Sequence, residues 1–339
     1  MTGQGELQQE PVSDGESLES AMTEILRVDP EAEQATRAAW LYFVAGNTQA
    51  QIGKKLGLSR IRINRLLAQA REQGLVQISV TGRLADCVAL EEQIKDRFGL
   101  QNAVVVPTPL AENQLPQLIG SAAGQFLGAR LEDGMSVAVG WGRTLRYSLR
   151  SVPRRSFKRL SVVSLIGGLT QASLVNPHET ATHLAEIIGA ECYYIAAPAL
   201  TDSETTRDIL ANQSMVREVL ERGAKADLAL LSVGELTQSS TMARVGLISH
   251  ADAASLVQAG AVGDICAHWI DKAGQVIAHP INKRVVALPP ERLKGISCAI
   301  LASGGRSKVP VLLGALLAGF VDVVVTDEAT ARSVLARAG

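Results

Sequence analysis

Apolar residues change their spacing along the chain near residue 103. Beyond that point, short runs of β-branched and other apolar residues alternate with segments long enough for helices. The runs predict strands at residues 104–106, 136–139, 161–166, 193–196, 228–233, 285–288, 298–301 and 321–325. The segments between them predict helices at residues 114–131, 144–151, 179–188, 205–222, 250–259, 309–318 and 328–338. Strands that are apolar almost throughout indicate a parallel sheet with helices on both faces, so a Rossmann-like, mostly parallel α/β domain is expected.

One stretch breaks this alternation. Residues 264–288 are rich in strand-forming residues and contain no helix-length segment, which predicts a small antiparallel insertion. Its turn is expected at residues 271–274, because Asp271 and Gly274 are typical turn residues.

Residues 47–67 predict two short helices joined by a tight turn at Gly57. Thr48 and Ser59 can each cap a helix, because a side-chain oxygen there accepts hydrogen bonds from unpaired backbone N–H groups. Ile52 and Leu56 are four residues apart and share one face of the first helix. The polar residues left on the exposed face at the start of the second helix are Arg60, Arg62, Asn64 and Arg65. This pattern is typical of a helix-turn-helix that presents its second helix to a DNA major groove.

The segments on either side of this helix pair complete the expected domain organisation. Residues 31–45 predict a helix that packs on this pair through Ala38, Leu41, Tyr42 and Ala45, and residues 75–80 predict a strand that forms a wing. We expect a disordered acidic tail over residues 1–30 and a winged helix-turn-helix DNA-binding domain over residues 31–83. A linker helix over residues 84–100 would lead to an effector-binding and oligomerisation domain over residues 101–339.

Charge is distributed unevenly, although the formal net charge of the 339 residues is only −1. Residues 1–33 hold nine acidic residues and one basic residue, whereas residues 34–83 hold eight basic residues and one acidic residue. Concentrated positive charge predicts operator double-stranded DNA as a partner, and the alternative is an ordinary helical hairpin with a solvated basic face. The residues expected to contact bases or phosphates are Thr48, Gln49, Lys54, Ser59, Arg60, Arg62, Asn64 and Arg65.

The composition, 47% apolar and 20% charged, is that of a soluble globular protein. No apolar run reaches the roughly 18 residues of a membrane-spanning helix and no signal peptide is evident, so no membrane partner is expected. The four cysteines lie far apart, which favours free thiols in a reducing compartment and a cytoplasmic protein. His178 and His183 are five residues apart, a poor spacing for a helical metal pair, so neither a metal nor another cofactor is expected.

Four glycine-bearing segments follow predicted strands, at the sheet edge where α/β proteins bind ligands. Residues 140–144 and residues 303–308 are cationic, and each segment opens a predicted helix, whose N-terminus favours an anion. Carboxylates such as Glu235 and Asp264 would accept hydrogen bonds from hydroxyl groups. Any one of these turns also has a structural explanation, because tight strand-to-helix turns need glycine, and Asp202 can instead cap a helix.

Together these segments predict a site for a small polyhydroxylated ligand, with or without a phosphate group. The candidate effector-binding residues are Gly140, Trp141, Gly142, Arg143, Thr144, Gly167, Gly168, Asp202, Glu235, Asp264, Gly304, Gly305 and Lys308.

The motifs that carry a resemblance to a known family run through residues 34–339. They are Thr48-Gln49, Ile52-Gly53-Lys54-Lys55-Leu56-Gly57-Leu58-Ser59-Arg60, Arg65-Leu66-Leu67, Gly140-Trp141-Gly142-Arg143-Thr144, Ala197-Pro198-Ala199-Leu200, Gly260-Ala261-Val262-Gly263-Asp264-Ile265, and Gly304-Gly305 with Lys308. In these motifs the chain resembles the SorC-type bacterial transcription regulators, which respond to sugars, polyols or their phosphates.

This resemblance implies a winged DNA-binding domain joined to an effector domain related to sugar-phosphate isomerases and deaminases. It also implies a homotetramer, or a dimer of dimers, on operator DNA. The effector pocket that it implies involves Gly142, Arg143, Thr144, Glu235, Asp264 and Lys308. Relatives that bind phosphorylated sugars often have a smaller, hydroxyl-rich loop in place of residues 141–143. The bulky Trp141 would instead suit closure over an unphosphorylated sugar or polyol, because an aromatic face packs well on C–H surfaces.

These features of the sequence bear on three candidate functions. The first is a transcription regulator, with repression as the commoner logic, of a carbohydrate or polyol catabolic operon, in which a small sugar, polyol or sugar phosphate shifts a conformational equilibrium. The second is a sugar-phosphate isomerase- or deaminase-like enzyme fused to a DNA-binding module. Such enzymes need a base and often a histidine, whereas residues 234–239 hold Glu235 alone, so no enzymatic activity is expected. The third, a purely architectural DNA-binding protein, is disfavoured by the large α/β domain.

Overall fold

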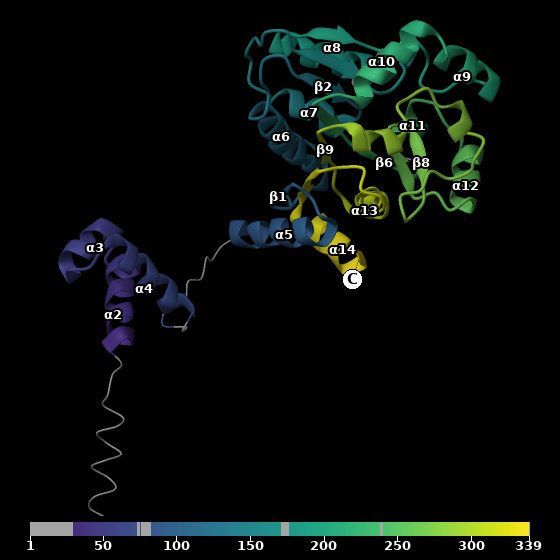
Figure 1. Ribbon diagram of the computed structural model, residues 1–339. Coiled ribbons are helices and arrows are strands. Elements are labelled where there is room, and N and C mark those ends of the chain that lie inside the picture. Colours follow the sequence, from purple (N-terminus) through teal and green to yellow (C-terminus); the bar gives the residue numbers. More distant parts are fainter. Residues whose placement is uncertain (1–29, 73–74, 76–82, 171–175, 238–239, 339) are drawn as a thin grey trace, which may run out of the picture. The chain divides into compact units, whose positions relative to one another are not determined.

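The computed structural model describes residues 30–72, 75, 83–170, 176–237 and 240–338, and it divides into two compact units between Val80 and Thr81 (Figure 1). The predicted acidic tail, apart from Pro30, and the predicted wing, apart from Leu75, lie outside the described residues. Pro30, the last residue of the expected tail, begins helix α2.

The smaller unit consists, within the described residues, of helices around one small apolar core. Its elements are α2 (Pro30–Ala39), the π-helical turn η1 (Trp40–Val44), α3 (Gln49–Leu56) and α4 (Arg60–Glu72). Ile52 from α3 and Ile63 and Leu66 from α4 are fully buried and pack against alanines of α2. The helix predicted over residues 31–45 is α-helical only as far as α2, and Tyr42 and Ala45, expected to pack on the pair, are exposed.

The larger unit is built on a seven-stranded sheet in which every neighbouring pair of strands is parallel. Its strands, in spatial order, are β1 (Asn102–Val106), β10 (Val323–Asp327), β9 (Cys298–Ala302), β5 (Leu228–Leu231), β2 (Ser136–Val139), β3 (Ser161–Ser164) and β4 (Glu191–Tyr193). The direction in which successive strands are added to the sheet reverses between β2 and β5. From β2 the chain adds β3 and β4 on one side, and from β5 it adds β9 and β10 on the other. The loops that follow β2 and β5 therefore adjoin each other at the carboxyl edge of the sheet, where open α/β sheets bind ligands.

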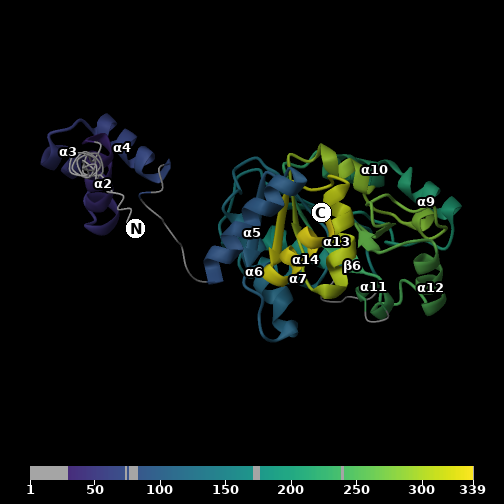
Figure 2. The same ribbon diagram turned by 90° about the horizontal axis from the view of Figure 1, so that it is seen from below.

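Helices cover both faces of this sheet, as the apolar strands predict. Val137 and Val139 pack in one layer, whereas Ala138 between them packs in the other, because side chains alternate along a strand. The first layer holds α6 (Leu115–Gly128), α7 (Arg143–Leu149) and α8 (Pro177–Ile188). The other holds α5 (Arg83–Phe98), α10 (Ser214–Ala224), α13 (Val309–Leu317) and α14 (Glu328–Ala338). α5 and α14 lie side by side (Figures 1 and 2). The Rossmann-like, mostly parallel α/β fold is thus confirmed.

A second, smaller sheet forms the predicted antiparallel insertion. Its strands are β6 (Val233–Glu235), β7 (Gly263–Ile265) and β8 (His268–Ile270). Cys266 and Ala267, both with positive φ, make the turn between β7 and β8, which the sequence did not predict. The predicted turn at residues 271–274 exists and follows β8, with a hydrogen bond of 3.0 Å from the Gly274 N–H to the Asp271 carbonyl.

Several predicted elements are wrong in extent. The strand predicted over residues 193–196 is β4, which ends at Tyr193, and the strand predicted over residues 321–325 is β10, which begins at Val323. The strand predicted over residues 228–233 divides at Ser232, so β5 and β6 belong to different sheets. Residues 285–288 do not form a strand. Val285 and Ala287 form isolated antiparallel bridges with Leu200 and Ile166, respectively, because this backbone pairs with two separate loops. Pro289 and Pro290 follow directly. The helix predicted over residues 205–222 is two helices that break at residues 212–213, α9 (Glu204–Ala211) and α10.

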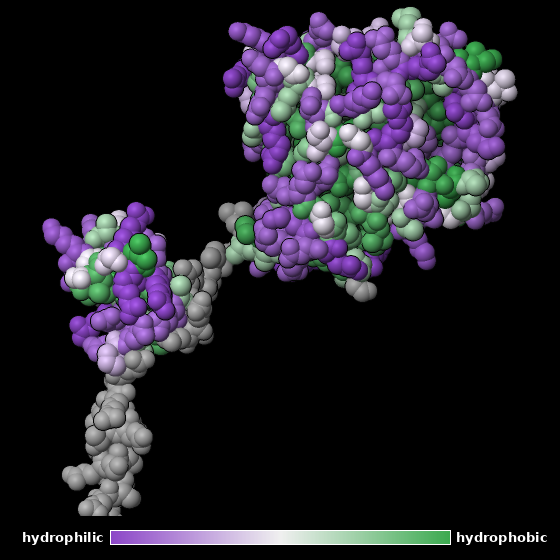
Figure 3. All heavy atoms as spheres, in the orientation of Figure 1, coloured by the Kyte–Doolittle hydropathy of each residue, from purple (hydrophilic) through white to green (hydrophobic). Residues whose placement is uncertain are grey.

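The remaining elements are short and lie mostly around the carboxyl edge of the sheet. They are η2 (Glu112–Gln114), α11 (Thr241–Arg244), α12 (His250–Gln258), η3 (Asn282–Arg284), η4 (Pro290–Gly295) and η5 (Arg306–Lys308). Among the described residues, no helix combines the length and the apolar character needed to cross a bilayer. On the face shown in Figure 3, apolar groups of the larger unit are interspersed among hydrophilic ones.

Candidate effector pocket and DNA-binding face

A cavity of about 450 Å³ opens at the strand-order reversal between β2 and β5. Segments that follow β2, β5 and β9 form much of its wall, together with the start of α6 and part of α11. The predicted effector residues that line it are Trp141, Gly142, Arg143, Thr144, Glu235, Asp264, Gly304, Gly305 and Lys308. Residues far apart in the sequence therefore converge on one concave site, of a size that suits a small ligand.

Three charged side chains of the wall form a mostly buried cluster. Lys308 Nζ lies 3.6 Å from Glu235 Oε2 and donates a hydrogen bond of 3.0 Å to the Val233 carbonyl. Asp264, which is 3% exposed, is paired in register with Gly234 across β6 and β7. A Cβ at Gly234 would overlap the Asp264 carboxylate, so this close approach requires glycine.

Burial changes the protonation of this cluster. It raises the pKa of the Asp264 carboxyl to about 7, although the Lys308 charge and a hydrogen bond from the Ala267 N–H oppose the change. Burial also lowers the pKa of Lys308, against the opposing effects of Glu235 and Asp264. A carboxyl group that titrates near neutrality can donate as well as accept hydrogen bonds, which matches the hydroxyl groups of a sugar or polyol.

We expect Asp264→Asn to remove a pH dependence of stability between about pH 4 and about pH 7. An aspartate with a raised pKa holds its proton more readily in the folded chain, so its stabilising contribution is present below its ordinary pKa of 3.8 and is lost as the pH rises towards 7. The slope for one group is at most about 1.4 kcal/mol per pH unit. Urea unfolding at about pH 5 and about pH 8 measures the free energy of unfolding of wild type and variant. An equal change in this free energy between the two pH values in both proteins would contradict the raised pKa.

Two glycine turns of the wall have positive φ angles. Gly142, with φ of 123°, precedes α7, and Gly305, with φ of 104°, precedes η5. The Gly305 N–H donates a hydrogen bond of 2.8 Å to Thr330 Oγ1 near the start of α14, so this loop is tied to that helix. Trp141 is only 7% exposed and belongs to the main core. It forms an apolar part of the wall, and its closure over a ligand stays a prediction.

Four predicted effector residues lie outside the lining, namely Gly140, Gly167, Gly168 and Asp202. Gly140 is buried at the end of β2, where its N–H donates a hydrogen bond of 2.9 Å to the Leu230 carbonyl. The Gly167 and Gly168 N–H groups donate to the carbonyls of Val286 and Ala197, and the His178 ring lies where a Cβ of Gly168 would be. Gly167 and Gly168 therefore permit close packing of neighbouring segments, whereas a Cβ at Gly140 would make only ordinary contacts.

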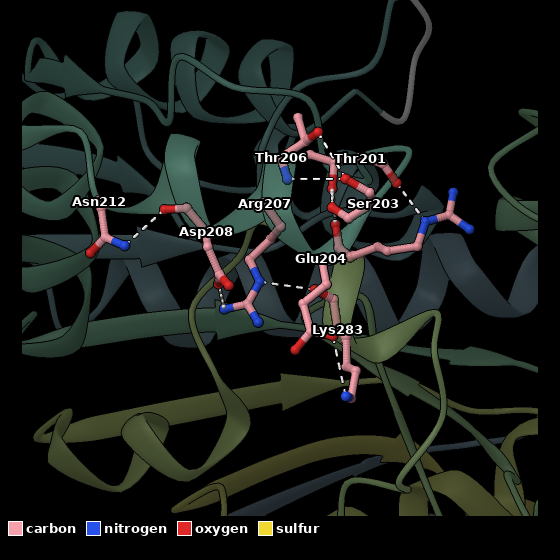
Figure 4. Close-up of polar contacts among 9 residues, drawn as sticks. Thr201, Ser203, Glu204, Thr206, Arg207, Asp208, Asn212 and Lys283 are labelled. Carbon is pink, nitrogen blue, oxygen red and sulfur yellow. Dashed lines mark hydrogen bonds and ion pairs between the residues drawn. The ribbon is translucent and has the colours of Figure 1, made fainter.

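Asp202 is exposed and adjoins a polar network at the start of α9, which Figure 4 shows. Ser203 caps this helix, because its Oγ accepts a hydrogen bond of 3.1 Å from the Thr206 N–H. Lys283 of η3 forms an ion pair of 3.2 Å with Glu204. The network fastens α9 to η3. Asp202 does not line the pocket, and Ser203, not Asp202, caps α9.

Several lining residues were not found from the sequence. Thr241 and Arg244 come from α11, and Glu112 and Asn113 come from the segment between β1 and α6. Neither segment has a glycine turn directly after a strand, so the rule that found the other loops gives no signal there. Arg244 is exposed and adds a further cation to the lining that already holds Arg143.

Helices α3 and α4 form the predicted helix-turn-helix. The Thr48 side chain accepts a hydrogen bond from the Gln51 N–H and the Gln51 side chain accepts one from the Thr48 N–H, so α3 begins with a capping box. Ser59 Oγ accepts a hydrogen bond of 3.2 Å from the Arg62 N–H at the start of α4. Gly57 ends α3 with φ of 68°. Both caps and the glycine turn are thus confirmed.

The predicted DNA-contacting side chains differ in their surroundings. The exposed ones are Thr48, Lys54, Ser59, Arg60, Asn64 and Arg65. Arg60 Nε donates a hydrogen bond of 3.3 Å to Gln49 Oε1, and both residues line a concave surface together with Thr48. Arg62 is instead held by an ion pair of 2.8 Å with Glu31, so its guanidinium faces α2.

We expect Arg65→Ala to weaken operator binding about tenfold or more and Arg62→Ala to weaken it less. Arg65 is exposed and free to approach base edges or phosphates, whereas Arg62 must first give up Glu31. Fluorescence-anisotropy titrations at one fixed salt concentration would measure both affinities. Equal losses in the two variants would contradict this orientation of α4.

Comparisons with known proteins agree on one family. The family model Sugar-bind, described as "Putative sugar-binding domain", matches residues 82–336. The erythritol catabolism regulatory protein EryD of Brucella abortus (strain 2308) is 31% identical over 310 residues, which cover 91% of this chain and 98% of that protein. The chain belongs to the SorC-type family of transcription regulators. The crystal structure of the full-length sorbitol operon regulator SorC from Klebsiella pneumoniae matches with a TM-score of 0.69 at 26% identity, covering 90% of this chain and 99% of that one.

A further relative extends the range of this family. The deoxyribonucleoside regulator of Bacillus subtilis (strain 168) is 30% identical over 312 residues, which cover 91% of this chain and 99% of that protein. These relatives are transcription regulators and not enzymes, so the SorC-type chain is a regulator that joins a helix-turn-helix to a sugar-binding domain. This finding supports the regulator and not the isomerase- or deaminase-like alternative.

Proposed function

We propose that this SorC-type regulator represses a carbohydrate or polyol catabolic operon and is controlled by a small sugar, polyol or sugar phosphate bound in the cavity. The observation that carries the proposal is the mostly buried cluster of Glu235, Asp264 and Lys308 in the cavity wall. Burying charged groups is unfavourable unless they have polar partners, and a hydroxyl-rich ligand supplies such partners. The names of EryD and SorC, which refer to erythritol and sorbitol, support a polyol or a related sugar.

The proposed ligand contacts follow from the chemistry of the lining. Asp264 and Glu235 accept hydrogen bonds from hydroxyl groups, and Lys308 donates one to a hydroxyl oxygen. Arg143 and Arg244 are exposed cations of the same lining and would pair with a phosphate group if the effector carries one. Gly142, Thr144, Gly304 and Gly305 shape the loops around the ligand, with Trp141 as an apolar wall.

On the DNA side, we propose that α4 enters the major groove of operator DNA. Arg60, Asn64 and Arg65 would contact bases or phosphates near the start of α4, with Asn64 suited to adenine. Thr48, Gln49, Lys54 and Ser59 would contact phosphates, and Arg62 would join them after leaving Glu31. A regulator of operon DNA is expected to act in the cytoplasm.

The proposed route from effector to DNA runs through α14 and α5. The Gly305 loop is tied to Thr330 in α14, and α14 packs on α5, where Arg332 lies 3.5 Å from Asp86. Arg97 of α5 also donates a hydrogen bond to the Ala338 carbonyl. Effector binding would change this packing, and through α5 the arrangement of DNA-binding units in a homotetramer or dimer of dimers.

A thermal-shift screen of the full-length protein against sugars, polyols and their phosphates tests the proposed function. A rise of several degrees in Tm for one compound, absent with inorganic phosphate alone, would identify the effector class. Failure of every compound to shift Tm at millimolar concentration would contradict a sugar-type effector in this cavity.

A further inference from the structure

The outward face of α4 carries an isoleucine. The buried side of this helix consists of Ile63, Leu66, Leu67 and Ala70. At about 100° per residue, Ile61, Arg65 and Ala68 lie on the opposite side of the helix. The Ile61 side chain is 83% exposed, and Ala68 is exposed as well. Ile61 therefore points away from the core of the smaller unit, on the face that the helix-turn-helix presents to DNA.

The neighbours of Ile61 are polar and basic. Arg60 precedes it, and Asn64 and Arg65, three and four residues further along, share its side of the helix and are exposed. The apolar core of the smaller unit, as far as the described residues form it, does not include Ile61. Figure 3 likewise shows apolar groups among hydrophilic ones on the surface of this unit. A large apolar side chain in a basic surface suits a partner that is both polyanionic and locally apolar.

We propose that Ile61 reads a thymine by packing on its C5-methyl group in the major groove. This proposal rests on the proposed DNA-binding function. The C5-methyl of thymine is the apolar group that base pairs present in that groove. Ile61 stands in the first turn of the recognition helix, whose N-terminal residues contact base edges. The positive charge of Arg60 and Arg65 complements the phosphates on either side, so duplex DNA fits this surface.

The test replaces thymine with deoxyuridine, which removes the methyl group and leaves base pairing unchanged. Binding sites for the full-length protein are first selected from a random duplex pool, and each thymine of a selected site is then replaced in turn. At one thymine in each half-site, the replacement should weaken binding by the wild type about fourfold, the effect of one buried methyl group. The same replacement should have no effect on Ile61→Ala, which already lacks the contact.

Val44→Ala is the matched control, because Val44 is a 69% exposed aliphatic residue of the same unit that lies outside α4. It should keep the wild-type response to deoxyuridine. Both variants should unfold at the wild-type temperature, since neither side chain is buried. If the deoxyuridine scan is the same for wild type and Ile61→Ala, the thymine contact is refuted while DNA binding and the proposed function stand. A pool that yields no enriched site would contradict both.

Discussion

Replacing Lys308 with methionine is expected to abolish the effector-induced thermal shift and to lower the free energy of unfolding by about 2 to 3 kcal/mol. Methionine has nearly the length of lysine but lacks the charge that lies 3.6 Å from Glu235 and that opposes the raised pKa of Asp264. The two carboxylates then remain in the wall without their cation. Because Asp264 can take up a proton, the loss of stability should be smaller near pH 6 than near pH 8.

Lys272→Met provides the control, because Lys272 is an exposed lysine in the turn after β8. It should leave both the thermal shift and the free energy of unfolding unchanged. Urea unfolding and calorimetric titration with the effector measure the two quantities separately. A Lys308→Met protein that binds the effector with wild-type affinity would exclude Lys308 from the pocket chemistry.

Gly124→Val should strongly destabilise the larger unit, with a loss of about 3 kcal/mol in the free energy of unfolding and a fall in Tm of about 6 to 12 °C. Gly120, Gly124 and Gly128 are four residues apart and form a stripe on α6 that lies against the chain of α7 and the segment after it. A Cβ at Gly124 would overlap the Ser148 carbonyl, and one at Gly120 would lie 2.5 Å from the Thr144 carbonyl. Valine would therefore force α7 outward.

The same substitution should weaken effector binding, because α7 begins at Arg143 in the cavity lining. Gln125→Val is the matched control, since it introduces the same β-branched residue at an exposed position of the same helix. It should reduce stability only by the small cost of valine in a helix, about 0.5 kcal/mol. Similar losses in the two variants would show that helix propensity, and not the close approach of α7, decides the effect.

The DNA-binding unit could be predicted because its determinants are local. Thr48 and Gln51 are three residues apart, Ser59 caps the helix that it precedes, and Gly57 makes its turn by itself. The pairing of Arg62 with Glu31 could not be predicted in this way, because it depends on how α2 packs on α4. Each residue's exposure follows from the same packing, which is why Ile61 was not singled out from the sequence.

Most of the pocket could be predicted because parallel strands bring their carboxyl ends to one edge. The rule failed at Gly167 and Gly168, whose backbone partners Ala197 and Val286 lie in distant segments. It also missed Arg244, which reaches the cavity from a four-residue helix that follows no strand of the main sheet. Contacts between segments that are distant in the sequence are set by the packing of the whole unit and leave no local signal.

On the proposed function, a ligand in the cavity changes the affinity of the chain for DNA. The most direct measurement is an anisotropy titration of a selected duplex with the full-length protein, with and without the compound that raises Tm, in wild type and Lys308→Met. The compound should weaken wild-type binding about tenfold or more and should leave binding by Lys308→Met unchanged. A compound that binds the wild type by calorimetry and leaves its affinity for DNA unaltered would contradict control of DNA binding by the cavity.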